Sequence, residues 1–152
     1  MRITLAAVGR AKAGPARDLY EFYAARLSWS LTLKEVEEHR TLAPAALKAS
    51  EGERLLAAVP KGARLIALDE AGRNLTSVAF AELLGRWRDD GLQDLAIVIG
   101  GAEGLSAAVG ERADLMLALG PMTWPHLLAR ALIVEQLYRA QTILSGHPYH
   151  RA

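Results

Sequence analysis

The segment LAIVIGG, residues 95–101, decides the predicted fold, because five consecutive apolar residues run straight into two glycines. A strand with one face in water alternates apolar and polar residues, so an unbroken apolar run predicts a strand that is covered on both faces. Two further runs have the same character, ARLIALD at 63–69 and DLMLALG at 114–120. Buried strands that alternate with helical segments are typical of an α/β fold with a mostly parallel sheet.

The surrounding segments complete this alternation. A buried strand is predicted over 2–9 and a strand with one wet face over 28–38, and helices are predicted over 14–27, 41–59, 76–90 and 125–144. Pro15 suits the first turn of the first helix. Leu19, Phe22, Tyr23 and Leu27 share one face of that helix at helical spacing. Gly52 predicts a weak point in the second helix, whose polar middle is expected to be mobile.

The helix over 125–144 is the longest and the most apolar. At 1.5 Å per residue, its twenty residues span roughly 30 Å. Apolar side chains cover most of its circumference, which predicts more than one burial surface. Glu135 and Arg139 are spaced to form an i,i+4 ion pair on the remaining face.

Composition predicts one globular domain over residues 1–152. The chain has no cysteine, which excludes a disulfide framework, a cysteine-based zinc site and a thiol nucleophile. No run approaches the ~18 apolar residues of a transmembrane helix, and the apolar start is too short for a signal peptide, so a soluble, cytoplasmic protein is expected. The net charge of +1 gives little support for general nucleic-acid binding. A small cluster, Arg10, Lys12 and Arg17, is either a solvated loop or a phosphate contact.

Three glycine-containing turns follow the three apolar strands: 68–74, 99–106 and 119–126. Parallel strands bring such turns to one edge of the sheet, which is where open α/β sheets bind ligands. GGAEG lacks the second glycine of G-x-G-x-x-G, and no Walker A motif is present, so the ligand is not expected to be held chiefly through phosphates. Backbone groups are expected to read an adenine, with Leu68 and Met122 as apolar walls.

Other chemistries have weak support. His147 and His150 have H-x2-H spacing, but a proline lies between them and no cysteine accompanies them, so no metal site is predicted. Ser106 and Ser145 lie outside any G-x-S-x-G motif, which disfavours a serine hydrolase.

The stretches LDEAGRNLTS, IGGAEGLS and MTWPHLLARALIVEQLYRAQTILSGHPYHR, together with AAVGRAK near the start, resemble the RlmH family of SPOUT-class rRNA methyltransferases over the whole length. This family methylates N3 of a pseudouridine in helix 69 of 23S rRNA. The resemblance implies an α/β trefoil-knot fold with a parallel sheet, a homodimer, and S-adenosyl-L-methionine as cofactor. It implies 23S rRNA or the ribosome as partner, with no membrane and no metal.

By motif position, the resemblance assigns cofactor binding to the three turns, at Leu68, Gly100, Leu119, Gly120, Pro121, Met122, Thr123 and Trp124. This chain departs from the family at Ala102, where proline is frequent, at Gly120–Pro121, and at Trp124, where leucine is frequent. The tryptophan is expected to reshape the adenine wall.

The resemblance also assigns chemistry to the C-terminal tail. His150 is the candidate to take the N3 proton, and Arg151 to stabilise negative charge on the base or to hold phosphate. Tyr149 is expected to contact the target base and Arg139 to grip RNA across the dimer. One chain's tail is expected to close over the other chain's cofactor. Two alternatives stay open: a non-catalytic dimeric RNA- or ribosome-binding protein of the same fold, and a small-molecule enzyme using another adenine nucleotide.

Overall fold

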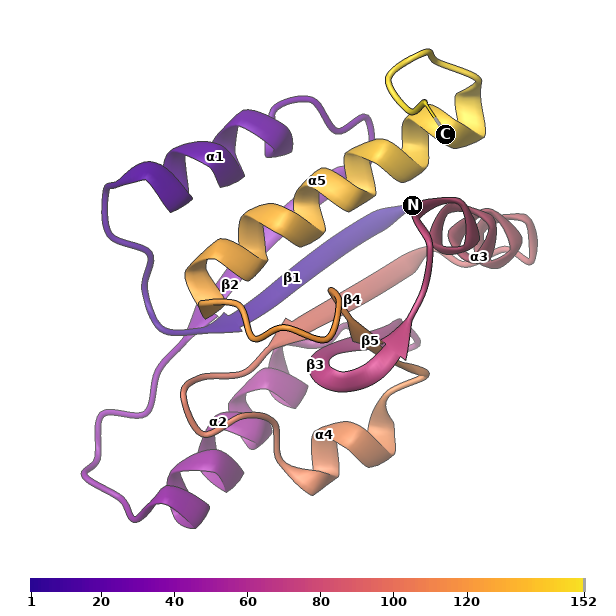
Figure 1. Ribbon diagram of the computed structural model, residues 1–152. Coiled ribbons are helices and arrows are strands. Elements are labelled where there is room, and N and C mark those ends of the chain that lie inside the picture. The colour runs from indigo at the N-terminus through magenta and orange to yellow at the C-terminus, as the bar shows by residue number, and fades with distance from the viewer. Residues whose placement is uncertain (152) are drawn as a thin grey trace.

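The computed structural model describes residues 1–151 and contains a five-stranded sheet in the order β2-β1-β4-β3-β5 (Figure 1). Every neighbouring pair is parallel, which confirms the predicted α/β fold with a parallel sheet. The strands are β1 (Arg2–Val8), β2 (Ser30–Val36), β3 (Arg64–Asn74), β4 (Asp94–Ile99) and β5 (Leu115–Ala118). The helices are α1 (Pro15–Ala24), α2 (Pro44–Ala58), α3 (Ser77–Asp89), α4 (Ala107–Arg112) and α5 (His126–Ser145).

Helices cover both faces of the sheet, with α1, α3 and α5 on one face and α2 and α4 on the other (Figure 1). The alternation along β4 shows why LAIVI is apolar throughout. Leu95, Ile97 and Ile99 belong to the core beneath α3 and α5. Ala96 and Val98 belong to the core beneath α2. Successive side chains of a strand point to opposite faces, so both faces must be apolar where both are covered.

Helix α5 packs against both α1 and α3 (Figure 1). Its interior residues Ile133, Val134 and Leu137 are fully buried. The predicted second burial surface of this helix therefore has neighbours within its own chain. The predicted ion pair is confirmed, with Arg139 Nη2 and Glu135 Oε1 2.6 Å apart.

Two predictions about the N-terminal helices were wrong. Helix α1 ends at Ala24 and not at residue 27. Leu19 and Phe22 are exposed, because the face of this amphipathic helix that packs on the core is the one that carries Tyr23. Helix α2 is continuous through Gly52, which is a packing residue. A Cβ at Gly52 would lie 2.8 Å from the Cβ of Ser106, so the glycine permits close approach of α2 to the start of α4.

Helix α4, absent from the sequence prediction, begins where Ser106 caps it. The Ser106 Oγ accepts a hydrogen bond from the backbone N–H of Val109 at 3.4 Å. With six residues, this helix is too short to show helical periodicity.

Replacing Gly52 with alanine is expected to lower the free energy of unfolding by about 1–2 kcal/mol, although alanine is the better helix former, because the new methyl group overlaps Ser106. Gly110→Ala is the matched control, since its Cβ would meet nothing within 4 Å among the described residues. This control is expected to raise stability by about 0.5–1 kcal/mol. Urea unfolding of both variants measures the two effects, and equal stabilisation by both would contradict the packing role of Gly52.

Candidate functional site

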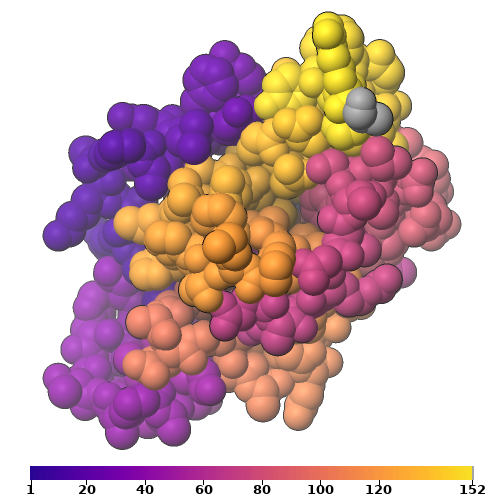
Figure 2. Space-filling model, viewed as in Figure 1, coloured from indigo at the N-terminus to yellow at the C-terminus, as the bar shows by residue number. Residues whose placement is uncertain are grey.

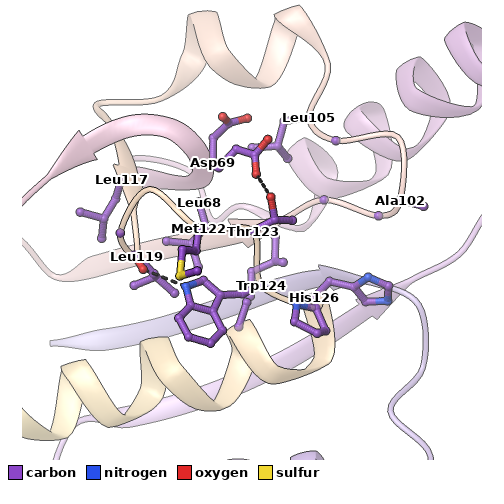
Figure 3. Close-up of a pocket in the computed structure, with 18 residues that line it drawn as sticks. Leu68, Asp69, Ala102, Leu105, Leu117, Leu119, Met122, Thr123, Trp124 and His126 are labelled. Carbon is purple, nitrogen blue, oxygen red and sulfur yellow. Dashed lines mark hydrogen bonds between the residues drawn. The ribbon is translucent and has the colours of Figure 1, made fainter.

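A cavity of about 390 Å³ lies at the carboxyl edge of the sheet, where β3, β4 and β5 end. The three predicted turns converge on it (Figure 3). Its lining residues include Leu68, Asp69, Glu70, Gly100, Gly101, Leu105, Leu119, Gly120, Met122, Thr123, Trp124 and His126. Parallel strands therefore bring together residues more than fifty positions apart in the sequence.

The turn after β4 is a compact backbone structure. Gly101 and Gly104 form an antiparallel bridge, and the Gly104 N–H donates to the Gly101 carbonyl at 3.0 Å. Gly104 has φ +80°, a conformation that favours glycine. A Cβ at Gly100 would lie 2.8 Å from the Gly104 carbonyl oxygen. Gly100 is thus required for the turn to close on itself.

The end of β3 curls over β5 and forms a second wall. Leu68 and Arg73 both pair with Leu117, so residues 69–72 bulge out between them. A Cβ at Gly72 would lie 2.8 Å from the Leu117 backbone, which leaves no room for a side chain there. This bulge carries Asp69 and Glu70 to the cavity.

The third wall is the loop between β5 and α5. Gly120 has φ +93° and turns the chain. The Trp124 Nε1 donates to the Leu119 carbonyl at 2.9 Å, and the Thr123 hydroxyl donates to the Glu70 carboxylate (Figure 3). These two bonds close the loop on itself and tie it to the β3 bulge. Met122 remains 73% exposed at the cavity mouth.

The structure brings together seven of the eight residues predicted to bind the cofactor: Leu68, Gly100, Leu119, Gly120, Met122, Thr123 and Trp124. Pro121 is not among the lining residues. Sequence reasoning missed Asp69, Glu70 and His126, which also line the cavity. The first two follow Leu68 directly, so the strand-end position was a usable signal for them.

The electrostatics of the cavity are acidic. Asp69 and Glu70 line it, and none of the lining residues within 1–151 is Lys or Arg. Behind the turn, the buried Glu51 of α2 lies close to Gly101, where a Cβ would be 2.5 Å from Oε2. Burial, reinforced by Glu103, raises the pKa of Glu51. Such a cavity favours a cationic ligand over a polyphosphate.

The C-terminal tail folds back on the last turns of α5. The Tyr149 hydroxyl donates to Glu135 Oε1 at 3.0 Å, and Arg139 Nη1 donates to His150 Nδ1 at 3.1 Å. The Arg139 guanidinium also lies over the Tyr149 ring, 4.8 Å from its centroid. Arg151 is exposed. Three of the four predicted catalytic residues, Arg139, Tyr149 and His150, therefore form one cluster, and Arg151 follows it directly.

The tail cluster lies along α5 at Glu135 and Arg139, whereas the cavity lies at the start of the helix, at His126. Glu135 and Arg139 are nine and thirteen residues from His126, which is roughly 14 and 20 Å along the helix axis. Figure 2 shows the yellow tail at the top of the view and the orange loop over 119–126 near its centre. None of the residues 147–151 lines the cavity of its own chain.

No helix over residues 1–151 is long and apolar enough to cross a membrane. No group of three or more His, Asp or Glu side chains in the described chain is placed to hold a metal ion.

The fold agrees with the comparisons to known proteins. Residues 1–150 match the family described as predicted SPOUT methyltransferase, so the chain belongs to the SPOUT methyltransferases. Within that class it belongs to the family of ribosomal RNA large subunit methyltransferase H. Relatives with that name from Rhodospirillum centenum and Paramagnetospirillum magneticum are 62% and 60% identical, over 100% and 99% of both chains respectively.

Solved structures support the same fold at low sequence identity. A probable methylase family protein from Haemophilus influenzae has a TM-score of 0.59 at 14% identity, with 99% of this chain and 70% of that chain covered. The SpoU methyltransferase AviRb from Streptomyces viridochromogenes has a TM-score of 0.51 at 15% identity, covering 92% of this chain and 58% of that chain.

Tyr149 is expected to remain protonated above pH 10, because burial, followed by hydrogen bonds to Tyr23 and Glu135, raises the pKa of its phenol above the ordinary 10.0. The folded state then holds a proton that the unfolded state loses above about pH 10, so this group's contribution to stability decreases as pH rises past that value. Ultraviolet titration of the native protein and of Tyr149→Phe measures the difference. If the native spectrum minus the Tyr149→Phe spectrum changes near pH 10, Tyr149 titrates as an ordinary phenol, which would contradict its placement against Glu135.

Proposed function

We propose that this protein is an S-adenosyl-L-methionine-dependent methyltransferase that modifies N3 of a pseudouridine in helix 69 of 23S rRNA. The observation that carries the proposal is full-length identity of 62% to a ribosomal RNA large subunit methyltransferase H, combined with the three-turn cavity at the sheet edge. A substrate on the large subunit or the ribosome places the protein in the cytoplasm.

The cavity fits this cofactor. Its turns offer backbone groups and its walls are apolar at Leu68, Leu119 and Met122, which suits an adenine. The carboxylates of Asp69 and Glu70 suit a ligand that carries a sulfonium and an ammonium group. The structurally similar AviRb was solved in complex with AdoMet, which is the same compound.

The residues that would hold the cofactor are the ones the sequence singled out: Leu68, Gly100, Leu119, Gly120, Pro121, Met122, Thr123 and Trp124. When bound, S-adenosyl-L-methionine supplies an electrophilic methyl group. The protein's part is to align the acceptor nitrogen and to manage the proton on it. The Trp124–Leu119 and Thr123–Glu70 hydrogen bonds hold the loop rigid for that purpose.

The tail supplies the proton chemistry. His150 takes the N3 proton, Arg151 stabilises the negative charge that develops on the base, and Tyr149 contacts the base. Arg139 carries only donors, so its contact makes His150 Nδ1 an acceptor and puts the neutral ring's proton on Nε2. The basic lone pair of His150 is therefore engaged. Release of this contact is the step that prepares His150 to accept a proton.

The active site is a two-chain site in this proposal. Within residues 147–151 no tail residue lines the cavity of its own chain, and the contact of His150 with Arg139 lies roughly 20 Å along α5 from His126, so a homodimer supplies the missing half from the partner subunit. A trefoil knot formed by the loops around the cavity accompanies this arrangement in the proposal.

The alternative function is a non-catalytic dimeric RNA- or ribosome-binding protein of the same fold. The closed Gly100–Gly104 turn and the ordered tail cluster favour the enzyme, because neither is needed for RNA binding alone. Mass spectrometry of 23S rRNA from cells that lack the protein tests the assignment. Loss of the methyl group at the helix 69 pseudouridine is expected, and unchanged methylation would refute the assignment.

Two inactive variants are expected to restore each other when mixed. Gly100→Ala disrupts the cavity turn, and deletion of residues 147–152 removes the tail, so each homodimer loses methyl transfer by at least ~100-fold. A mixed dimer pairs the intact cavity of one chain with the intact tail of the other. Co-refolding at equal concentration is expected to return about a quarter of the wild-type rate, since half the dimers contain one complete site. Methyl transfer from labelled cofactor to large subunits is the measurement.

The controls for this mixing experiment are the two variants refolded separately and a mixture of Gly100→Ala with a chain carrying both changes. None of these three preparations contains a complete site, so all three must stay inactive. A thermal shift with S-adenosyl-L-methionine is expected for the tail deletion and not for Gly100→Ala. Methyl transfer at the wild-type rate by the tail deletion alone would contradict the proposed catalytic role of the tail.

A further inference from the structure

A second cavity, of about 530 Å³, lies between the β1–α1 connection, the start of α1 and the first turns of α5. Figure 1 shows the connection passing beside the start of α5. Four cationic side chains line this cavity, and three of them, Arg10, Lys12 and Arg17, are the basic cluster that stood out in the sequence. The proposed mechanism uses none of them.

The floor of this cavity contains a buried cation. Arg130 is 2% exposed, and its guanidinium donates to Glu35 Oε2 at 2.7 Å and to the carbonyls of Val8 and Gly9 at 3.1 and 2.8 Å. Its Nε has no hydrogen-bond partner within the part of the chain that the structure describes. The Nε atom is itself sealed from solvent, so a ligand in the cavity meets the positive charge of Arg130, which lines it, and not this donor.

The N-terminus of α1 adds unpaired backbone donors to the same cavity. Over residues 1–151, no side chain caps this ten-residue helix, whose N-cap is Gly14. The N–H groups of Ala16 and Arg17 lie in its first turn and have no intrahelical acceptor. Both residues line the cavity. A helix N-terminus with free N–H groups carries partial positive charge and favours an anion.

The acidic groups at this site are already engaged. Glu35 accepts from Arg130 and, at 2.7 Å, from the Ala11 N–H, and these contacts together lower its pKa although burial, the largest single influence, raises it. Glu21 pairs with Arg17 at 3.0 Å on the exposed surface, where such pairs are weak and readily exchanged. Lys12 has no carboxylate within 4 Å among the described residues. The Lys12 ammonium is thus available to a ligand.

The two cavities flank the same turns of α5. Pro125, His126 and Ala129 line the cofactor cavity, whereas Leu127 and Arg130 line the second one. A helix with its side chains is about 10 Å wide, so the two cavities on its two sides lie within the reach of neighbouring nucleotides of one strand. A strand whose base enters the first cavity would therefore carry a nearby phosphate past the second.

We propose that the cavity formed by the β1–α1 connection, the α1 N-terminus and Arg130 binds a backbone phosphate of the RNA substrate, close to the nucleotide that is methylated. This inference rests on the proposed function. The cavity would give a chain whose net charge is only +1 a local site for anions, at the same edge of the sheet as the first cavity. Lys12 contacts the phosphate from the rim, and Arg10 does so by exchanging its exposed ion pair with Glu37, in which Nε and Oε2 are 3.3 Å apart. Arg130 holds the floor.

The double variant R10A/K12A tests the proposal, with K61A/R86A as the matched control. Lys61 and Arg86 are exposed and line neither cavity, so the control removes the same charge elsewhere. R10A/K12A is expected to raise the KM for large ribosomal subunits about tenfold with kcat little changed. It should also reduce the slope of log affinity for 23S rRNA against log salt by about 1 per lost phosphate contact. The control is expected to keep the wild-type KM and slope.

A wild-type KM and salt slope in R10A/K12A would overturn the site, provided that the native protein methylates the subunits. Absence of methylation by the native protein would instead refute the proposed function. A thermal shift of the variant on addition of S-adenosyl-L-methionine reports that the variant is folded and binds the cofactor. Thermal shift with inorganic phosphate separates the sources of the anion. If R10A/K12A loses a phosphate-induced shift but keeps full RNA affinity, the cavity serves a free anion and the assignment to RNA is wrong.

Discussion

The buried guanidinium of Arg130 is the interaction on which the placement of both cavities depends. It joins α5 to Glu35 on β2 and to the backbone at the end of β1. A buried charge that loses its partner is costly, so these contacts hold the first turns of α5 at a defined place on the sheet edge. The loop over residues 119–125 runs directly into that end of α5. The same contact thus positions the third wall of the cofactor cavity on one side and the basic cavity on the other.

Close backbone approach is the second constraint on the site. At Gly72 and Gly100, a side chain would overlap backbone atoms at 2.8 Å, and Gly101 leaves room for Glu51 behind the turn. The cavity is therefore shaped by backbone packing more than by particular side chains. This accounts for the tolerance of the turn to Ala102, a position whose side chain is exposed at the cavity rim. Trp124 differs, because its indole bonds to Leu119 and stabilises the loop in a way that leucine does not.

Apolar patterning predicted the parallel sheet well, because burial on both faces leaves an unmistakable run such as LAIVI. It also placed the three turns at one edge, with Leu68 and Met122 as apolar walls, whereas the other proposed cofactor residues came from the family resemblance. Patterning failed where an element is short or where a glycine serves packing, as with α4 and Gly52. It could not find the Arg130–Glu35 contact, since the two residues are 95 positions apart and no local periodicity relates them. The tail's folding onto Glu135 was likewise outside the reach of local rules.

In the proposed function the chain makes two kinds of RNA contact, and the place of the tail on α5 explains why. The tail is held against Glu135 and Arg139 and does not line the cavity of its own chain, so in this proposal its chemistry acts where a partner's cavity is presented to it. A contact across two chains depends on their mutual position and so cannot by itself set the register of the substrate on one subunit. The basic cavity beside the cofactor cavity belongs to one subunit, and Arg130 fixes the distance between the two cavities. A phosphate held there would place the target base relative to the cofactor before the partner's tail acts on it.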